Sequence, residues 1–395
     1  MKILFYGETP TIETGLAQVA KQHMRTFVSL GWEIDAVCIN MFDHVYDDIK
    51  HPYNLIGCPL NDAFNKDLMH KYIRAGDYDV VFMSADCGVC DEFFDDIIYM
   101  RGQKVFRLYV YIPVDCDVIG PEPFRIMTIA DYAATYSNHS KEVLKTILPN
   151  VYVETIYLGC DTETFHPISL EERREIRSKL FGVNDDTFIV LNVNRNQWRK
   201  DIARSMKGFH LFHEHTPDSL LYLHMKQNDV GGSLPTYAKM LGMKWEGDER
   251  EVYFSSLDFK DAYGVDRRVL NQIYNMSDVY ISSSTGEGWG LCTTDAMCCN
   301  LPVIVPRNTA NLDLVGENER GYYVECGGDD LWSMPYGMTN NPRDIISCRD
   351  LSCQLGYVYR HREESRERAK AAYEWCKINS WNTFQDKWLE VLRPW

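Results

Sequence analysis

Two acidic residues around a glycine-rich turn are the most chemically suggestive feature of this chain. Glu287 begins the turn Gly288-Trp289-Gly290-Leu291, and Asp295 follows Glu287 by eight residues. An apolar run at 279–284 predicts a buried strand before the turn, and the residues from Leu291 onward predict a helix. Loops at the carboxyl ends of strands border the ligand crevice of an open α/β sheet, and a helix start there attracts phosphate. The segment therefore predicts a site for a hydroxyl-rich, phosphorylated ligand.

Two basic residues in another loop could complete such a site. Arg195 and Lys200 lie in the polar stretch NRNQWRK, directly after the apolar run 188–193. Arginine offers a planar fork that suits phosphate, and lysine offers a mobile point charge. Alone, both residues could belong to an ordinary solvated loop. Beside the acidic turn, they predict stabilisation of the negative charge that grows on a departing diphosphate.

Strand-like and helix-like segments alternate along the chain and must position these residues. Apolar runs predict strands at 3–6, 34–39, 80–83, 105–112, 132–136 and 151–157, and again at 188–193, 220–224, 252–255, 279–283 and 303–305. The apolar stripe over 15–30 predicts a helix. Such alternation is typical of doubly wound parallel sheets. We therefore predict two Rossmann-like α/β domains.

The domain limits follow from a linker signal and a charged tail. His166-Pro167 and the polar helix-like segment 169–179 separate a first domain, 1–168, from a second, 169–370. A C-terminal helix within 371–395 is expected to pack back on the first domain. The tail 361–395 reads as two helices broken near Asn379, and the region 331–359 as a loop-rich insertion.

Several enzyme classes are excluded by motif or geometry. The first strand is followed by Gly7-Glu8-Thr9-Pro10, without the G-x-G-x-x-G of nicotinamide enzymes, and no G-x-x-x-x-G-K-[ST] phosphate loop occurs. Glycoside hydrolases place two carboxylates on opposite sides of the scissile bond. Glu287 and Asp295 would instead lie along one wall, so the hydrolase interpretation is weak.

The composition of the chain limits which binding partners and which cellular compartment are expected. The 57 acidic and 41 basic residues give a net charge of −16, which argues against a general nucleic-acid binder. No apolar stretch is long enough to predict a membrane span, and the N-terminus reads as a strand and not as a signal peptide. The 13 cysteines, including Cys87-Gly88-Val89-Cys90, read as small buried residues, reduced in a cytoplasmic setting.

Four sequence blocks resemble the family 4 retaining glycosyltransferases. They are E-G-W-G-L-x-x-x-D-A-M with N-L-P-V-I-V at 287–305, the Arg–Lys loop at 194–200, the interdomain signature I-Y-L-G-C-D…F-H-P at 156–167, and I-Y-N-M-S-D-V at 273–279. The resemblance covers about 130–325 and, more loosely, the remainder. It implies the GT-B fold, in which two Rossmann-like domains face each other across a cleft.

The resemblance also implies roles for single residues. Glu287, Arg195 and Lys200 would be catalytic, with Glu287 holding sugar hydroxyls. The donor would be bound by the remaining residues of the turn, by Asp295 and by a first-domain glycine: Gly15, Gly288, Trp289, Gly290, Leu291 and Asp295. The family usually has Glu where this chain has Asp295, so a water or a backbone shift would have to bridge the shorter side chain to the ribose.

Two first-domain residues are candidates for contact with acceptor or sugar. Asp115 stands where many family members place a histidine, and His139 begins a predicted helix that could line the cleft. Each also has a plain structural interpretation, as a strand-end acid and as a helix-capping residue. Asp115-Cys116-Asp117 is a D-x-D sequence, but the other blocks fit a metal-independent architecture, so no metal or cofactor is expected.

The sequence thus predicts a retaining hexosyltransferase that uses UDP-glucose or GDP-mannose and acts on a glycan or glycoprotein acceptor chosen by the loops 41–64 and 87–94. A nucleotide-sugar epimerase, a sugar phosphorylase and a non-catalytic sugar-nucleotide-binding protein are the alternatives, and a DNA-base glycosyltransferase would need a local basic groove. Length and cysteine content resemble glycosyltransferases of large algal viruses, which would place the protein in a host cytoplasm.

Overall fold

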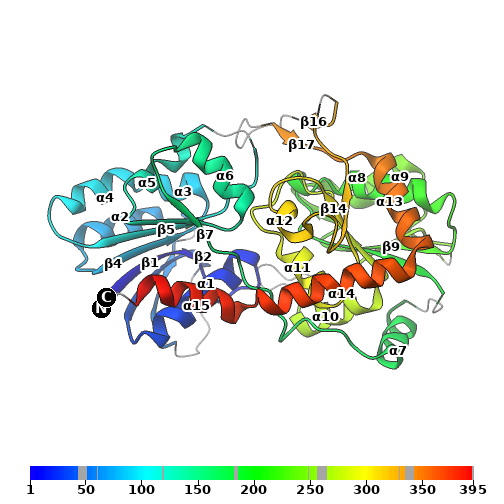
Figure 1. The fold of residues 1–395 in the computed structure, drawn as a ribbon, viewed down its shortest axis with the longest axis horizontal. Coiled ribbons are helices and arrows are strands. Elements are labelled where there is room, and N and C mark those ends of the chain that lie inside the picture. The colour runs from blue at the N-terminus through cyan, green and yellow to red at the C-terminus, as the bar shows by residue number, and fades with distance from the viewer. Residues whose placement is uncertain are drawn as a thin grey trace.

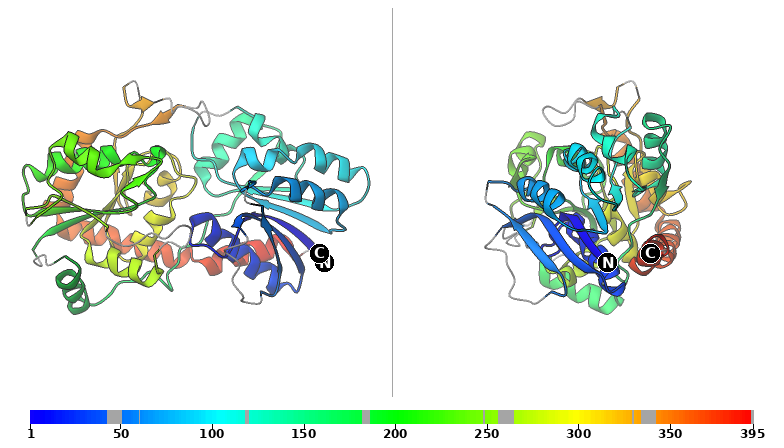
Figure 2. Two further views of the ribbon diagram at one scale, coloured as in Figure 1. Left: turned by 180° about the vertical axis from the view of Figure 1, so that it is seen from behind. Right: turned by 90° about the vertical axis from the view of Figure 1, so that its left-hand side faces the viewer.

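The computed structural model describes residues 1–42, 51–59, 61–117, 120–181, 186–247, 249–255, 265–328, 330–333 and 342–393. Within them, two parallel sheets follow one another along the chain and lie at opposite ends of an elongated molecule (Figure 1). Helices cover both faces of each sheet (Figure 2). The prediction of two doubly wound parallel-sheet domains is confirmed.

The first sheet has the order β3-β2-β1-β4-β5-β6-β7 in the described residues. Its strands are β1 Lys2–Glu8, β2 Glu33–Phe42, β3 Asn54–Cys58, β4 Val80–Ser84, β5 Arg107–Ile112, β6 Tyr132–Thr135 and β7 Val153–Thr155. Side chains alternate between its faces: Ile3 and Phe5 join one apolar cluster, whereas Leu4 and Tyr6 join another. Both faces are therefore buried, which explains the continuous apolar runs.

The second sheet repeats this pattern in the order β12-β9-β8-β13-β14-β15. Its strands are β8 Phe188–Val193, β9 Ser219–His224, β12 Val252–Phe254, β13 Val279–Ile281, β14 Val303–Pro306 and β15 Tyr322–Val324. In each sheet the strand order reverses beside the first strand, between β1 and β4 and between β8 and β13. Ligands of such sheets bind in the crevice at that switch point.

Helices surround the sheets. In the first half they are α1 Gly15–Ser29, α2 Lys66–Ala75, α3 Cys87–Asp91, α4 Phe94–Arg101, η2 Glu122–Phe124, α5 Arg125–Thr128 and α6 Asn138–Ile147. In the second half they are α7 Leu170–Phe181, η3 Trp198–Lys200, α8 Ile202–His213, α9 Leu234–Leu241, α10 Arg267–Met276, α11 Leu291–Cys298, α12 Asn311–Val315 and α13 Cys348–Arg360. Two short antiparallel strand pairs are also present. They are β10 Asn228–Asp229 with β11 Gly232–Ser233, and β16 Trp332–Ser333 with β17 Arg343–Asp344. Among the described helices, none combines the length and the apolar character that a membrane span requires.

Two C-terminal helices tie the halves together. Helix α14, Arg362–Ile378, packs on α11, and α15, Trp381–Leu392, packs on α1 (Figure 1). Gln385 Nε2 donates to Gln22 Oε1 at 2.9 Å across the α1–α15 contact. The predicted helix break near Asn379 is confirmed, and residue 371 lies within α14. The expectation of a loop-rich insertion at 331–359 is wrong for Cys348–Arg360, because α13 occupies it.

Candidate functional site

The loops after β8 and β13 lie side by side because these two strands are adjacent and parallel. Backbone and hydroxyl hydrogen bonds fasten one loop to the other. Thr285 N donates to Arg199 O at 2.8 Å, and Ser283 Oγ donates to Lys200 O at 2.8 Å. Two segments about 85 residues apart in sequence thus form one wall at the carboxyl ends of the strands, as the switch-point rule requires.

Glu287 is the buried centre of this wall, with 8% of its surface exposed. Its carboxylate contacts the Lys200 ammonium and accepts a hydrogen bond from Arg199 Nη1 at 3.3 Å. Burial by itself raises the pKa of Glu287, but the charges of Lys200 and Arg199 outweigh it and lower the pKa to about 2. The carboxylate is therefore ionised at neutral pH and held in a fixed direction.

Lys200 is equally buried, at 8% exposure, at the end of η3. Burial and the neighbouring Arg199 lower the pKa of Lys200, whereas Glu287 opposes this shift. Two cations contact one carboxylate, an arrangement that suits a diphosphate, and the first-domain acids Asp115 and Asp86 also act on Arg199. The sequence analysis predicted no role for Arg199. Its position directly before Lys200 is the sequence feature that could have indicated one.

Arg195 is not brought together with Glu287. Its side chain is 64% exposed and forms a forked pair with Asp229, through Nε at 2.9 Å and Nη2 at 3.3 Å. Asp229 lies in β10, in the loop that follows β9. Arg195 is therefore at the rim of the wall, where a change of rotamer would be needed to reach a ligand beside Lys200.

The turn 288–291 contributes backbone groups to the site, and its Trp289 side chain is buried elsewhere. Gly290 has φ +102°, a conformation that favours glycine, and precedes α11 with no side-chain hydrogen bond capping that helix start. The N–H groups of Thr293 and Thr294 donate to Gly290 O, so the positive end of the α11 dipole lies at this turn. The Trp289 ring is buried at 3% exposure, with its centroid 5.0 Å from that of Tyr157, so its side chain does not line the site.

The first domain touches this turn directly. A Cβ placed on Gly286 would collide with the carbonyl oxygen of Asp115, and one on Gly288 would lie 2.6 Å from Cβ of Pro113. On the other side, a Cβ on Gly15 would lie 3.2 Å from Leu291 Cδ1. The structure thus brings the predicted residues Gly15, Asp115, Gly288 and Leu291 to one interdomain contact.

Acidic groups occupy the carboxyl ends of three neighbouring first-domain strands. Glu8 ends β1, Asp86 follows β4, and Asp115 follows β5. Burial raises the pKa of Glu8 to about 7, against a hydrogen bond from Asn40 Nδ2 at 3.0 Å. Asp115 pairs with the buried Arg343, Nη2 to Oδ1 at 3.0 Å. The sequence interpretation found only Asp115, because Glu8 and Asp86 sit in stretches that match no motif.

His139 lies at a different interdomain contact. Its Nε2 is 2.7 Å from Asp117 Oδ1, and its backbone N–H donates to Asp313 Oδ2 at 3.1 Å. Asp313 belongs to α12 of the second half, so the start of α6 binds a carboxylate from across the chain. This arrangement favours the structural interpretation of His139, as a residue at a helix start, over direct contact with a transferred sugar.

Asp295 lies on α11, the helix that follows the turn, and 7% of its surface is exposed. Burial raises the pKa of Asp295 well above its usual range, although the Arg267 charge lowers it. Arg267 is itself engaged by Asp161, Nη2 to Oδ2 at 2.8 Å. Among the described residues, no side-chain hydrogen bond to Asp295 is formed, so the carboxyl group is available to a ligand hydroxyl.

The site segment matches a known family model. Residues 263–333, which include Glu287 and Asp295, match the model of the glycosyl transferases group 1. This part of the second domain is thus similar to the group 1 glycosyltransferases. Spore coat protein SA of Bacillus subtilis is 25% identical over 271 residues, covering 64% of this chain and 62% of that relative. The match thus spans less than two thirds of that relative's length.

Solved glycosyltransferase structures share the whole fold. Sucrose-phosphate synthase from Thermosynechococcus elongatus has a TM-score of 0.75 and 16% identity, covering 100% of this chain and 98% of its own. HepE from Anabaena, solved in complex with UDP-glucose, has a TM-score of 0.68 and 15% identity, covering 100% of both chains. The group 1 segment and these likenesses agree on a GT-B architecture of two facing α/β domains.

Proposed function

We propose that this chain is a retaining glycosyltransferase that moves a hexosyl group from a nucleotide diphosphate sugar to an acceptor hydroxyl. One observation carries the proposal: the ionised Glu287, buried against Lys200 and Arg199, lies in a turn that touches the first-domain loop at Asp115. Donor-binding and acceptor-binding walls would meet there. The group 1 match over residues 263–333 supports the same activity.

The charges suit departure of a nucleoside diphosphate. Lys200 and Arg199 carry two positive charges against the one negative charge of Glu287, and the uncapped start of α11 adds backbone donors. These fixed groups would stabilise negative charge on the leaving diphosphate without reorganising during the reaction. Glu287 would in turn accept hydrogen bonds from hydroxyls of the transferred sugar.

Transfer would then proceed on one face of the sugar. The acceptor oxygen forms a bond to the anomeric carbon as the bond from that carbon to the phosphate oxygen breaks. The departing phosphate oxygen takes the acceptor proton, so neither a protein nucleophile nor a metal ion is required. The acids Glu8, Asp86 and Asp115 are placed to accept hydrogen bonds from acceptor hydroxyls on the opposite wall.

The donor identity remains a proposal between two candidates. UDP-glucose and GDP-mannose were both predicted, and the UDP-glucose complex of HepE makes UDP-glucose the first to test. The predicted acceptor loops 41–64 and 87–94 contain strand β3 and helix α3, respectively, and residues 43–50 and 60 lie outside the described residues. A glycan or glycoprotein acceptor, a cytoplasmic setting and an algal-virus source stay predictions from the sequence.

A two-stage experiment tests the proposal. A thermal-shift screen of UDP-glucose, GDP-mannose and related donors should find a stabiliser, because a ligand at 100 times its dissociation constant adds about 2.7 kcal/mol. The bound donor is then incubated with candidate glycans in chelator, and the anomeric configuration of the product is read by NMR.

The outcomes separate the alternatives. Transfer with retained configuration in chelator supports the proposal. Binding without transfer would favour a non-catalytic sugar-nucleotide-binding protein, and a new sugar nucleotide formed from donor alone would favour an epimerase. Loss of donor binding in Lys200→Ala, but not in Lys179→Ala on the exposed face of α7, would locate the binding at the site described.

A further inference from the structure

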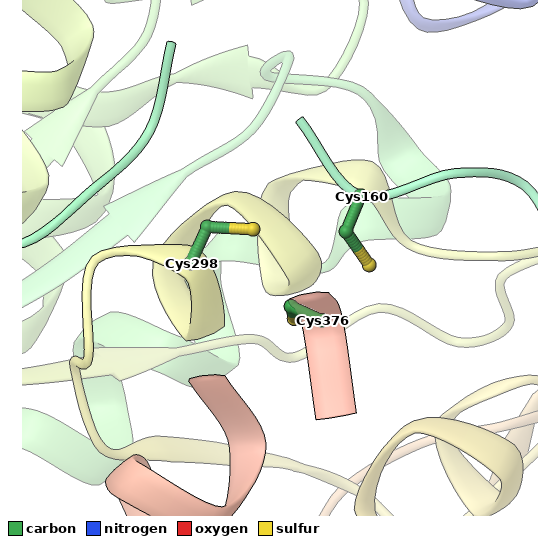
Figure 3. Close-up of side chains that lie close together, drawn as sticks. All are labelled: Cys160, Cys298 and Cys376. Atoms are coloured by element: carbon green, nitrogen blue, oxygen red, sulfur yellow. The ribbon is translucent and has the colours of Figure 1, made fainter. Parts of the chain in front are cut away.

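Three buried cysteine thiols converge outside the proposed donor site. The Sγ atoms of Cys160, Cys298 and Cys376 all lie within 4.8 Å of one another (Figure 3). Their residues are 1%, 0% and 0% exposed, respectively. Most buried cysteines pack singly as small apolar residues. Among the described residues, this is the group of ligand-type side chains close enough to share one ion.

The three thiols come from elements that meet where the domains join. Cys160 lies in the segment between the two sheets, Cys298 ends α11, and Cys376 lies in the last turns of α14. The backbone N–H of Cys160 donates to Asn379 O at 2.8 Å, so the interdomain segment is hydrogen-bonded to the α14–α15 junction. The cluster therefore sits at a fixed junction of linker, donor-turn helix and C-terminal helices.

The sulfur separations fit a tetrahedral thiolate site. With metal–sulfur bonds near 2.3 Å, tetrahedral ligands lie about 3.8 Å apart. Sulfurs within 4.8 Å of one another would need to approach by roughly 1 Å or less, a shift within the reach of side-chain rotation. Thiolates prefer Zn²⁺ and other soft ions over Mg²⁺ or Ca²⁺.

Two carboxylates lie near the thiols in sequence, but the set within 4.8 Å of one another comprises the three cysteines alone among the described residues. Asp295 precedes Cys298 by three residues on α11 and so projects from the same side of the helix. Asp161 directly follows Cys160 and also acts on Cys298 electrostatically. Asp161 is paired with Arg267, and Asp295 is kept for the donor, so the fourth ligand would be water.

We propose that Cys160, Cys298 and Cys376 form a structural binding site for Zn²⁺ or a similar thiophilic divalent cation. Binding would form three metal–sulfur bonds and release the three thiol protons to solvent. The ion would fasten the linker and α14 to α11, the helix that begins at the donor turn. It would stabilise the interdomain arrangement and take no part in sugar transfer.

The test uses the full chain, stripped with chelator under reducing conditions and titrated with ZnCl₂ or CoCl₂. We expect about one Zn²⁺ per chain after gel filtration, a higher melting temperature, and for Co²⁺ the intense near-ultraviolet absorption of thiolate–cobalt charge transfer with tetrahedral visible bands. Cys298→Ala and Cys376→Ala should lose the ion and the absorption. Cys38→Ala, which removes an equally buried thiol from β2, should keep both.

Two results would overturn the proposal. If the stripped wild-type chain binds no Zn²⁺ and Co²⁺ gives no thiolate absorption, the thiols only pack as apolar groups. If a metal-free chain prepared without reductant has two fewer titratable thiols, mapped to this cluster, the site is a disulfide and not a metal site. Should the alanine variants fail to fold, the cobalt spectrum of the wild-type chain alone still decides between these outcomes.

Discussion

Replacing Glu287 by glutamine should unbalance the buried charges of the proposed donor site. The Glu287 and Lys200 side chains are only 11% and 9% exposed and contact each other directly. Glu287→Gln keeps the shape but removes the negative charge. The buried Lys200 and the partly exposed Arg199, whose side chain is 29% exposed, then lack their counter-charge, which destabilises the fold.

The magnitude follows from the pKa of Glu287. It falls from the usual 4.5 to about 2, and a difference of about 2.5 pH units corresponds to about 3 kcal/mol. Because the folded-state pKa is the lower one, this stability is present above pH 4.5 and is lost as pH falls toward 2. Glu287→Gln should therefore cost about 3 kcal/mol at pH 7 and remove that part of the acid dependence.

A double-mutant cycle by urea unfolding measures the pair itself. Glu287→Gln and Lys200→Met are compared with the double variant, in which both charges are gone. We expect the double variant to recover about 2–3 kcal/mol relative to the sum of the single losses, because removing both partners of a buried pair is far less costly than removing one. The exposed pair Glu175–Lys179, with side chains 61% and 70% exposed, should couple by less than about 1 kcal/mol.

Two results would refute this reasoning. One is additivity of the two single losses within about 0.5 kcal/mol, which would mean that Glu287 and Lys200 do not interact. The other is an unchanged acid-unfolding profile in Glu287→Gln. A double variant that folds well but turns over about a hundredfold more slowly would separate the stability of the pair from its role in transfer.

Three further predictions concern the edges of the site. Gly286→Ala should lower turnover at least about tenfold, because its Cβ would strike the Asp115 carbonyl. The control Gly88→Ala, which has open space around its Cβ, should not lower turnover, and equal steady-state rates for the two variants would contradict this prediction. Arg195→Ala should weaken donor binding, measured by calorimetry, without lowering the melting temperature, since the Arg195 side chain is 64% exposed. A lower melting temperature would mark Arg195 as structural. Asp295→Ala should weaken donor binding roughly fivefold, since a lost hydrogen bond costs about 1 kcal/mol, and unchanged binding would exclude the ribose role.

Strand positions were the most predictable part of the fold. Strands buried on both faces read as dense apolar runs, and β8, β9, β13 and β14 appear close to their predicted positions. Strands β3 and β15 were missed. The apolar run of β3, NLIGC, is interrupted by Gly57, and β15 consists of the three residues YYV.

The candidate site was predictable in its residue types but not in its pairings. The spacing from Arg195 to Lys200 resembles a family loop and predicts roles for these two residues, but not for Arg199. In the fold, η3 turns Arg199 toward Gly286 and Glu287, while Arg195 points to Asp229. A 3-10 turn of three residues decides which cation faces the carboxylate, and no periodicity of the sequence encodes that turn.

The structure requires glycine in the turn 286–290 for two different reasons. Gly290 adopts the positive φ of +102° that precedes α11. Gly286 and Gly288 lack side chains because Asp115 and Pro113 of the other domain occupy that space. Glycines that resemble a phosphate cradle in the sequence therefore also accommodate the loop of the first domain.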